Sequence, residues 1–271
     1  MTHTKFGKYI IQDTIKSGGM ACIYKASDPE TKDIVAIKTL QPSKINRRAV
    51  KGFIQEAKML KKLNHPNIIQ VMDFGEEDNR TPYIVMEYIN GEDLKKLLLH
   101  KKTKKLQRYN LIIQIGRGLA YLHENNIIHQ DIKPENILVS KNGEVKIIDF
   151  GLARYNRLRI LTRNRFIDGT PTYMSPEQIR KKHRDKRTDI YSYGITTYET
   201  LTGRAPYQAN DKNAIMRAHI DINIHPRPIS YYDASIPKNI ENCVMKAIEK
   251  NPNKRYRTVS EMLLDFSRSK I

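Results

Sequence analysis

The chain has 271 residues, of which 39% are hydrophobic and 28% charged, a balance that excludes wholesale disorder and allows one large domain or two lobes. No apolar run approaches the roughly 20 residues of a membrane span, and the first residues lack the apolar core of a signal peptide, so the cytoplasm is the expected compartment. The net charge of +19 fits an anionic partner or a solvated basic surface, but without an RNA-binding aromatic signature or a helix-turn-helix pattern nucleic acid is not expected as the primary partner.

The first part of the chain alternates short β-like runs with turn residues, which predicts a small antiparallel sheet. One stretch between these runs, Val50–Leu63, carries apolar residues at helical spacing and predicts a single helix beside the sheet. The predicted strands are Tyr9–Ile15, Cys22–Ala26, Ile34–Thr39, Ile69–Phe74 and Tyr83–Tyr88.

After Asn90-Gly91 the pattern changes to long helical stretches separated by Gly and Pro, which predicts a second lobe that is mainly α. The last helical pattern runs almost to Ile271, and no internal repeat or low-complexity tail is visible. The clearest helical patterns are Leu106–His123, Thr188–Thr202 and Ile236–Lys250.

The two cysteines, Cys22 and Cys243, have no CxxC spacing and no histidine at a metal-binding distance in the sequence. We therefore expect neither a zinc site nor a disulfide framework. Both residues are interpreted as small buried hydrophobic side chains.

Several polar residues follow one another in an order that suits phosphoryl transfer from a nucleotide, which needs a cation on the phosphates, oxygen ligands for Mg²⁺ and a carboxylate near the acceptor hydroxyl. Lys38 ends the apolar run Val35-Ala36-Ile37, and Glu56 lies on the predicted helix that follows. The segment 129–136, His-Gln-Asp-Ile-Lys-Pro-Glu-Asn, places Asp131, Lys133 and Asn136 in one short loop. Asp149 opens an Asp-Phe-Gly run after another apolar strand.

Taken together, these residues resemble the eukaryotic-type protein kinase family, and the bacterial serine/threonine branch is the most similar. The resemblance covers essentially the whole chain, residues 1–271, as one kinase domain. It implies an α+β bilobal fold, with a sheet lobe over about residues 1–86, a hinge at 87–91 and a mainly α lobe at 92–271. Six signals in sequence are far more specific than any one of them alone.

The resemblance assigns a catalytic role to each matching residue. Lys38, oriented by Glu56, would contact the α- and β-phosphates of ATP, and Asp131 would orient and deprotonate the acceptor hydroxyl. Lys133, in the run typical of serine/threonine kinases, would stabilise the transferred phosphoryl group, and the Thr170 hydroxyl would bridge Asp131 and Lys133. Asn136 and Asp149 would bind Mg²⁺, with Mn²⁺ as an alternative.

The resemblance also implies a nucleotide site. Its glycine-rich loop departs from the family pattern, because Lys16 and Ala21 stand where glycines are usual, while Gly18 keeps the central position that lets the backbone approach phosphate. We still expect nucleotide to bind. Met86 would be the gatekeeper, and the expected nucleotide contacts are Ile15, Lys16, Ser17, Gly18, Gly19, Met20, Ile23, Ala36, Lys38, Met86, Glu87, Ile89 and Leu138.

Further positions match structural features of the family. The segment 169–177 resembles the end of the activation segment, where protein substrates bind, with Ser175 in place of the usual alanine. Glu177 is expected to pair with Arg255, and Asp189 to anchor the catalytic loop. His129 is interpreted as a packed residue rather than a base, in an expected spine made of Leu60, Val71, His129 and Phe150.

Gln130 replaces the arginine that in the family pairs with a phosphorylated activation loop. A neutral amide binds phosphate more weakly than a guanidinium does, so we expect basal activity that does not depend on loop phosphorylation. Arg154 keeps another basic position of that phosphate pocket, and Thr162 is the most plausible phosphoacceptor in the loop.

Basic stretches at 101–108, 154–167 and 180–187 leave two interpretations open, a solvated basic face or a surface that recruits acidic proteins or anionic surfaces. The sequence therefore predicts a kinase that acts on serine and threonine of protein substrates. A pseudokinase scaffold that binds nucleotide without turnover is the main alternative. A small-molecule phosphotransferase, which would lack the peptide-binding segment, and a nucleic-acid binder are further alternatives.

Overall fold

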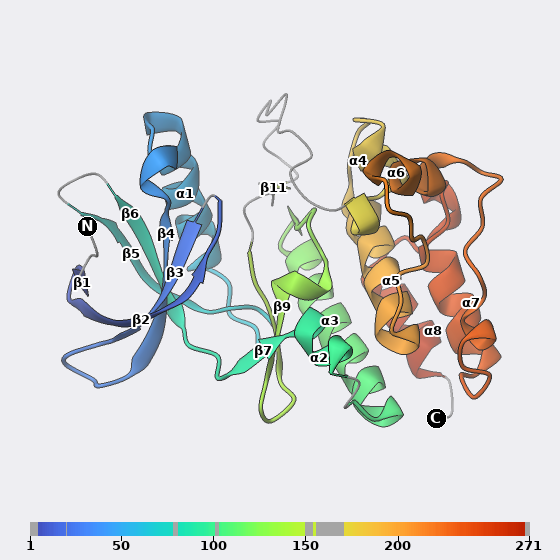
Figure 1. Ribbon diagram of the computed structural model, residues 1–271, viewed down its shortest axis with the longest axis horizontal. Coiled ribbons are helices and arrows are strands. Elements are labelled where there is room, and N and C mark those ends of the chain that lie inside the picture. Colours follow the sequence, from blue (N-terminus) through green and yellow to red (C-terminus); the bar gives the residue numbers. More distant parts are fainter. Residues whose placement is uncertain are drawn as a thin grey trace. The chain divides into compact units, whose positions relative to one another are not determined.

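The computed structural model in Figure 1 describes residues 5–19, 21–77, 81–100, 103–149, 154–155 and 171–268, with the backbone alone at 154–155. The chain divides into two units, residues 1–91 and residues 92–271. The first unit carries a β-sheet with one α-helix, and the second is mainly helical.

The first unit contains a six-stranded sheet in the order β1-β2-β3-β4-β6-β5, in which all neighbours are antiparallel. The predicted antiparallel sheet is thereby confirmed. The sequence pattern missed the first strand, because two residues are too short for an alternation to show. The strands are β1 Lys5–Phe6, β2 Tyr9–Ser17, β3 Ala21–Ser27, β4 Ile34–Leu40, β5 Val71–Glu76 and β6 Pro82–Glu87.

One face of this sheet forms a hydrophobic core. Val35 and Ile37, which are two residues apart on β4, are both fully buried there, so Ala36 and Lys38 point to the opposite face. The Tyr83 ring lies against two glycines, because a Cβ at Gly75 would come within 2.5 Å of its hydroxyl and a Cβ at Gly7 would clash as well. The core consists of Phe6, Tyr9, Ala26, Val35, Ile37, Tyr83 and Val85.

A single helix, α1 (Arg47–Leu60), packs against β5 and β6. It begins three residues earlier than the sequence predicted, because Asn46 caps it: its side-chain oxygen accepts a hydrogen bond from the backbone N–H of Ala49. Phe53 and Ala57 bury the apolar face. The short 3₁₀ helix η1 (Pro42–Lys44) precedes it.

The second unit contains two small sheets. β9 (Ile137–Ser140) forms antiparallel pairs with β10 (Val145–Ile147) in the sheet β10-β9-β7, whose edge strand β7 is Gly91–Asp93. β8 (Ile127–Ile128) pairs with β11 (Arg154–Tyr155). β8 and β9 flank the segment 129–136.

The helices of the second unit confirm the mainly α prediction, although its boundaries differ. The predicted Ile236–Lys250 helix begins after Pro237 and ends at Ala247, and three helices that the pattern did not single out are present. They are α2 Leu94–Leu99, α3 Lys105–Glu124, α4 Pro176–Ile179, α5 Lys186–Thr202, α6 Lys212–Ile220, α7 Lys238–Ala247 and α8 Val259–Ser267, with 3₁₀ turns η2 Pro134–Asn136, η3 Pro171–Tyr173, η4 Ile229–Tyr231 and η5 Pro252–Lys254.

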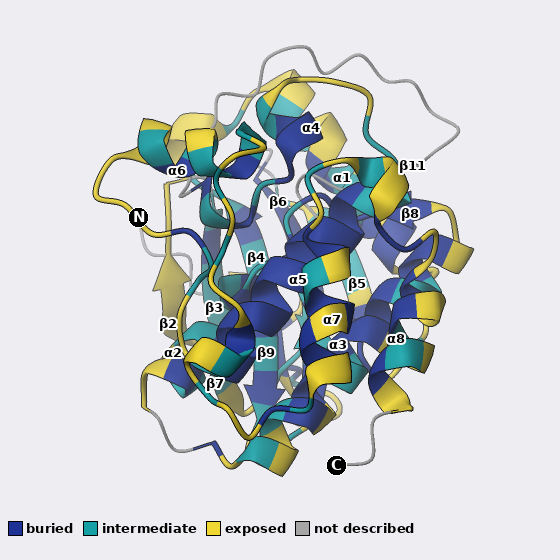
Figure 2. Cartoon of the chain, turned by 90° about the vertical axis from the view of Figure 1, so that its right-hand side faces the viewer, coloured by how far each residue is buried: buried dark blue, intermediate teal, exposed yellow. Residues whose placement is uncertain are grey.

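Helix α5 is the centre of this unit, since every residue from Thr188 to Leu201 is buried, as its dark blue ribbon shows in Figure 2. It contacts α3 and α7. Gly194 allows the close approach to α7, because a Cβ there would lie 2.7 Å from Ile248 and 2.9 Å from Ala247. None of the helices in the described part of the chain combines the length and the apolar composition that a membrane span requires.

The two cysteines lie where the sequence predicted, Cys22 at 8% and Cys243 at 3% exposure, and neither is in a disulfide. Burial raises the pKa of the Cys243 thiol to about 11.

Candidate active site

The loop between β8 and β9 brings three of the predicted catalytic side chains together. The Asp131 carboxylate oxygen Oδ2 accepts hydrogen bonds from Lys133 Nζ at 2.8 Å and from Asn136 Nδ2 at 2.9 Å. Its other oxygen, Oδ1, has no hydrogen bond to another described residue, and the side chain is 30% exposed. Asp131 is thus held by two donors and still presents an acceptor toward solvent.

Asn136 is oriented by the same contacts. Its Nδ2 donates to the backbone oxygen of Asp131 and to Oδ2 of that residue, both at 2.9 Å. The amide oxygen Oδ1 must therefore point away from Asp131, and it accepts no hydrogen bond from the described residues. The backbone N–H of Ile148 donates to the backbone oxygen of Asn136 at 3.0 Å, and the exposed Asp149 is the next residue along the chain. Amide and carboxylate oxygens are ligands that Mg²⁺ prefers, so the chemistry of these two residues fits the metal that the sequence implied.

The buried Asp189 fixes the start of this loop. Its Oδ2 accepts hydrogen bonds from the backbone N–H of His129 at 2.8 Å and from His123 Nε2 at 2.9 Å, and its Oδ1 accepts from the backbone N–H of Gln130 at 2.7 Å. Asp189 is fully buried on α5. The predicted anchoring of the loop by Asp189 is confirmed.

The His129 ring is buried and hydrogen-bonded within the fold. Its Nδ1 accepts a hydrogen bond from the backbone N–H of Asp131 at 3.2 Å, so Nε2 carries the proton and donates to the backbone oxygen of Ile148 at 3.1 Å. The residue is fully buried. Both ring nitrogens are engaged, which supports its interpretation as a packed residue rather than a base.

Gln130 has partners that sequence reasoning missed. It adopts a left-handed backbone with φ of 67°, its side-chain oxygen accepts a hydrogen bond from Arg184 Nη1 at 3.1 Å, and its backbone oxygen accepts one from Gln178 Nε2 at 2.8 Å. Its side-chain Nε2 is buried without a partner in the part of the chain that the structure describes. The guanidinium of Arg184 therefore lies beside Gln130, the position where the family has an arginine.

The basic run 180–187, which the sequence left as either a solvated face or a recruiting surface, is partly used inside the fold. Besides Arg184, Arg180 donates to the backbone oxygen of Ile220 at 2.8 Å. Arg187 is paired with Asp185 at 2.6 Å. An arginine run in a sequence does not distinguish such internal partners from solvent.

In the first unit, Lys38 Nζ on β4 lies 3.2 Å from Glu56 Oε1 on α1, with the two side chains only 14% and 13% exposed. This is the contact that the sequence suggested. The pair is more buried than the surface ion pairs whose contribution is usually small. It positions the ammonium group on the sheet face opposite the hydrophobic core.

The same face carries other predicted nucleotide contacts. Side chains opposite one another on neighbouring strands point to the same side of a sheet. Ile23 is opposite Lys38, and Ala36 is opposite Met86, so these four residues share one face. Glu87 follows on β6, where its side chain accepts a hydrogen bond from the backbone of Gln70.

Two further predicted contacts are half-buried: Ile89 follows β6, and Leu138 lies on β9 in the second unit.

The glycine-rich segment forms a turn between β2 and β3. Ile15, Lys16 and Ser17 end β2 and are exposed, and the N–H of Gly18 donates to the backbone oxygen of Ala21 at 3.0 Å. A residue that the sequence did not indicate, Gln41, holds this turn. Its Nε2 lies 2.9 Å from the Gly18 backbone oxygen, 3.0 Å from Ser17 Oγ and 3.1 Å from Cys22 Sγ.

The packing of the described residues around this turn does not require a glycine at position 18 or 19. Among the described residues, a Cβ at Gly18 would meet only the Ala21 backbone oxygen at an ordinary 3.6 Å, and a Cβ at Gly19 would meet no atom within 4 Å. The open space above the turn is therefore available to a ligand.

Several residues singled out from the sequence lie outside the described residues. These are Met20, Phe150, Thr162, Thr170 and the side chain of Arg154. Leu60 and Val71 of the expected spine are buried in the first unit, and His129 is buried in the second.

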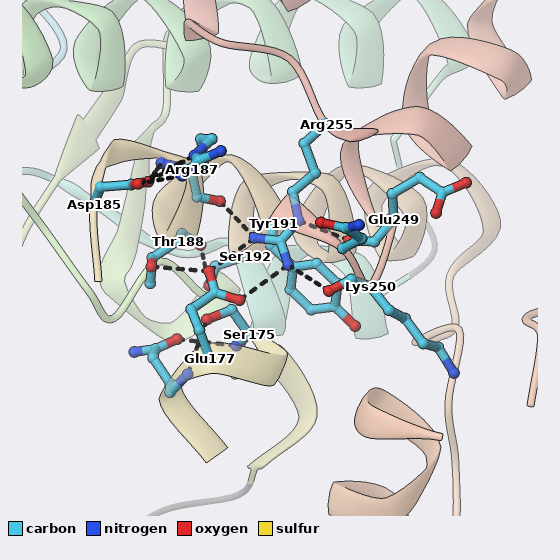
Figure 3. A network of polar contacts seen from close by, with 12 residues as sticks. Ser175, Glu177, Asp185, Arg187, Thr188, Tyr191, Ser192, Glu249, Lys250 and Arg255 are labelled. Carbon is cyan, nitrogen blue, oxygen red and sulfur yellow. Dashed lines mark hydrogen bonds and ion pairs between the residues drawn. The ribbon is translucent and has the colours of Figure 1, made fainter. Parts of the chain in front are cut away.

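The segment that begins at Pro171 is tied to α5 and η5 by the network in Figure 3. Arg255 Nη1 lies 2.8 Å from Glu177 Oε1, and Nη2 lies 3.0 Å from Oε2, which confirms the predicted pair. Thr188 Oγ1 donates to the same carboxylate at 2.9 Å. Burial raises the pKa of Glu177, but hydrogen bonds from Arg255 and its charge outweigh this effect, so the pKa lies below its ordinary value.

Ser175, at the position where the family usually has alanine, has a local structural role. Its Oγ accepts a hydrogen bond from the N–H of Gln178 at 3.3 Å, while Gln178 Oε1 accepts from the N–H of Ser175 at 2.9 Å. This reciprocal capping box starts the short helix α4, which carries Glu177.

Tyr173, just before this helix, is joined to Glu199 and Lys95. The Tyr173 hydroxyl donates to Glu199 Oε2 at 2.5 Å, and Lys95 Nζ donates to Glu199 Oε1 at 2.5 Å. Burial, reinforced by the negative charges of Glu199 and Glu135, raises the pKa of Tyr173 well above its usual range. Tyr173 therefore stays protonated and fixes this part of the segment against α5.

Comparison with known proteins places these features in a family. The family model described as the protein kinase domain matches residues 9–265. The chain is 37% identical over 266 residues to the serine/threonine-protein kinase PrkC of Bacillus subtilis, covering 96% of this chain and 40% of that protein. It is 35% identical over 273 residues to the serine/threonine-protein kinase PknB of Mycolicibacterium smegmatis, covering 96% of this chain and 43% of that protein.

The chain thus spans about two fifths of the length of the curated relatives that it matches. Among solved structures, the PknI kinase domain of Mycobacterium tuberculosis matches with a TM-score of 0.75 at 20% identity, covering 99% of both chains. This likeness confirms the predicted kinase fold, with its sheet unit and its helical unit. The chain belongs to the protein kinase family, among relatives that are bacterial serine/threonine kinases.

Proposed function

We propose that this chain transfers the γ-phosphoryl group of ATP to serine and threonine hydroxyls of protein substrates, with Mg²⁺ as the metal and Mn²⁺ as a possible substitute. The observation that carries the proposal is the arrangement of Asp131, whose Oδ2 is held by Lys133 and Asn136 while Oδ1 makes no bond within the described residues. A carboxylate fixed in this way can accept the proton of an incoming hydroxyl.

Lys133 and Asn136 have complementary tasks in this proposal. The Lys133 ammonium, 2.8 Å from Asp131, lies where negative charge develops as the phosphoryl group moves toward the acceptor oxygen. Asn136 and Asp149 would hold Mg²⁺, which supplies charge neutralisation on the phosphate oxygens. The proton of the substrate hydroxyl passes to Asp131 Oδ1 as the new oxygen–phosphorus bond forms and the bond to the ADP leaving group breaks.

Lys38, held by Glu56, would contact the nucleotide phosphates, and Ile23, Ala36 and Met86 on the same sheet face would contact its base and sugar. The glycine turn supports nucleotide binding, because the fold itself tolerates a Cβ at Gly18. A glycine that the chain does not need for its own packing is expected where a phosphate approaches the backbone.

Protein substrates are proposed because the relatives carry the name of serine/threonine-protein kinases and because the segment 171–177 is rigidly tied to α5. The cytoplasm is the proposed compartment. Control by phosphorylation of Thr162 is not required by this proposal, since the neutral Gln130 stands where the family has the arginine that pairs with a phosphorylated loop.

The test is transfer from γ-labelled ATP to a generic basic protein and to the chain itself, compared among wild type, Asp131→Asn and Lys38→Met. We expect each variant to lose about 10²-fold or more of the rate, because each removes one positioned catalytic group. Asp33→Asn, an exposed aspartate of the first unit, is the matched control and is expected to keep full activity.

Loss of transfer in the two site variants with retained nucleotide binding would support the proposal. A folded wild type that binds nucleotide but transfers no phosphate under Mg²⁺ or Mn²⁺ would instead support the alternative, a nucleotide-binding scaffold without turnover.

A further inference from the structure

A groove of about 680 Å³ lies on the second unit, between α3 and the turn that joins β9 to β10. Gln114 on α3 joins the two walls of the groove by hydrogen bonds. Its Nε2 donates to the backbone oxygen of Gly143 at 2.9 Å, and its Oε1 accepts from the backbone N–H of Val145 at 2.9 Å. The groove is therefore built between a long helix and a turn that is hydrogen-bonded to it.

Three cations line the groove, Lys104 and Arg117 from α3 and its N-cap, and Lys141 from the turn. All three are exposed, and their side chains make no hydrogen bond or ion pair with any other described residue. Among the described lining residues there is no aspartate or glutamate. The groove therefore has three positive charges that the surrounding structure does not neutralise.

The rest of the lining consists of amides, one glycine and three aliphatic side chains. Leu106 is 60% exposed, Ile113 is half-buried about two turns further along α3, and Leu111 between them is buried. No aromatic side chain is among the described lining residues, so the groove offers no platform for stacking nucleic-acid bases. Cations beside aliphatic carbon fit an acidic polypeptide that carries an apolar residue better than they fit a nucleic acid.

The dimensions fit a short extended segment. Lys104 and Arg117 are thirteen residues apart in sequence, which corresponds to about 20 Å along a helix and to about six residues of extended chain. Strand β9 leads from Asn136 to this turn, so Lys141 lies about 16 Å from the candidate catalytic loop at about 3.3 Å per residue. One polypeptide can reach both places.

We propose that this groove binds an acidic segment of a protein substrate, with Lys104, Arg117 and Lys141 contacting its carboxylates and Leu106 contacting an apolar side chain. Binding itself is independent of phosphoryl transfer. Its use in substrate recruitment rests on the proposed function.

The test is fluorescence anisotropy with a labelled octapeptide of glutamate and aspartate around one central leucine, and with its glutamine and asparagine counterpart. The test variant is Lys104→Gln/Arg117→Gln/Lys141→Gln. The matched control, Lys212→Gln/Lys254→Gln/Arg257→Gln, removes the same charge from exposed positions outside the groove. The Asp131→Asn variant serves to measure binding without turnover.

We expect the acidic peptide to bind wild type, the control and Asp131→Asn alike, and to bind the groove variant about 8- to 125-fold more weakly, at about 2- to 5-fold per cation. Leu106→Ala should weaken binding about 3-fold, as expected for a partly buried aliphatic contact. Binding should also weaken as ionic strength rises from 0.01 to 0.15 M, because the screening length falls from about 30 to about 8 Å.

Equal weakening in the groove variant and the control would overturn the proposal, since net charge alone would then explain binding. Equal binding of the amide peptide, or groove-dependent binding of a single-stranded oligonucleotide in preference to the acidic peptide, would overturn it too. Since the readout needs no catalysis, a failure here is distinguishable from a failure of the proposed kinase activity. If both hold, fusing the acidic segment to a substrate should lower its KM in wild type and not in the groove variant.

Discussion

The ion pair between Arg255 and Glu177 allows a quantitative prediction about stability. The Arg255 side chain is fully buried and donates to both carboxylate oxygens of Glu177, at 2.8 and 3.0 Å. It also donates to the backbone oxygens of Glu249 at 2.7 Å, Arg187 at 2.9 Å and Lys250 at 3.3 Å. Arg255→Met keeps most of the volume but leaves a buried carboxylate and three carbonyl oxygens without this donor.

Removing one partner of a buried pair typically costs about 3–5 kcal/mol of the free energy of unfolding. At about 2–4 °C per kcal/mol for a protein of this size, the melting temperature should fall by about 6–20 °C. Adding Glu177→Gln to Arg255→Met should restore part of the loss, because the unpaired negative charge is then gone. Arg187→Met, which breaks the half-exposed pair with Asp185, is the control and should cost about 1 kcal/mol or less.

The pair also predicts a pH dependence, measured by urea unfolding of wild type and Glu177→Gln. Since the pKa of Glu177 lies below its ordinary value of 4.5 in the folded protein, its contribution is complete above that value and is lost as the pH falls through the folded pKa. The stability difference between the two proteins should be constant from pH 8 to about 5 and shrink below 4.5. An Arg255→Met protein as stable as the Arg187→Met control, or a difference that grows as the pH falls, would refute this reasoning.

Two other substitutions test features of the site. Gly18→Ala should leave the melting temperature unchanged but raise the nucleotide Kd about 10-fold, as expected when one hydrogen bond to a charged group is weakened. The control is Gly116→Ala, whose Cβ would lie 2.6 Å from Leu263. It should lower the free energy of unfolding in urea by about 1–3 kcal/mol. Gln130→Arg restores the family residue, yet it should destabilise the fold by about 1–3 kcal/mol. It places a cation at a buried position beside Arg184, in place of the amide oxygen that accepts a hydrogen bond from Arg184. A calorimetric scan that finds no loss, or no recovery on adding Arg184→Ala, would contradict that expectation.

The repeating patterns of the sequence predicted which helices and strands form, but not the residues at which they begin and end. Alternation in Val35-Ala36-Ile37-Lys38 placed Lys38 opposite the core, and the structure agrees. The start of α1 was missed by three residues, because Asn46 sets it through a side-chain cap rather than through apolar spacing. Elements as short as β1 and α4 are stabilised by their neighbours and leave no period to detect.

The candidate site likewise contains some contacts that the sequence predicts and others that it does not. Asp131, Lys133 and Asn136 are close in sequence, so a short loop necessarily brings them near one another. Contacts such as Gln41 to the glycine turn and Arg184 to Gln130 join residues 23 and 54 positions apart. Nothing in the local sequence distinguishes these two side chains from ordinary surface residues, so a single sequence could not reveal them.

The anchoring of the loop by Asp189 has a consequence for the order in which the chain becomes competent during synthesis. The two backbone amides that Asp189 holds lie 60 and 59 residues before it, so the loop leaves the ribosome well ahead of its anchor. At about 5–20 residues per second, the delay is about 3–12 s. During that interval the carboxylate that orders the loop does not yet exist, and a nascent chain carries the residues of the site without their arrangement. The loop therefore becomes ordered only once α5 has been made and buried.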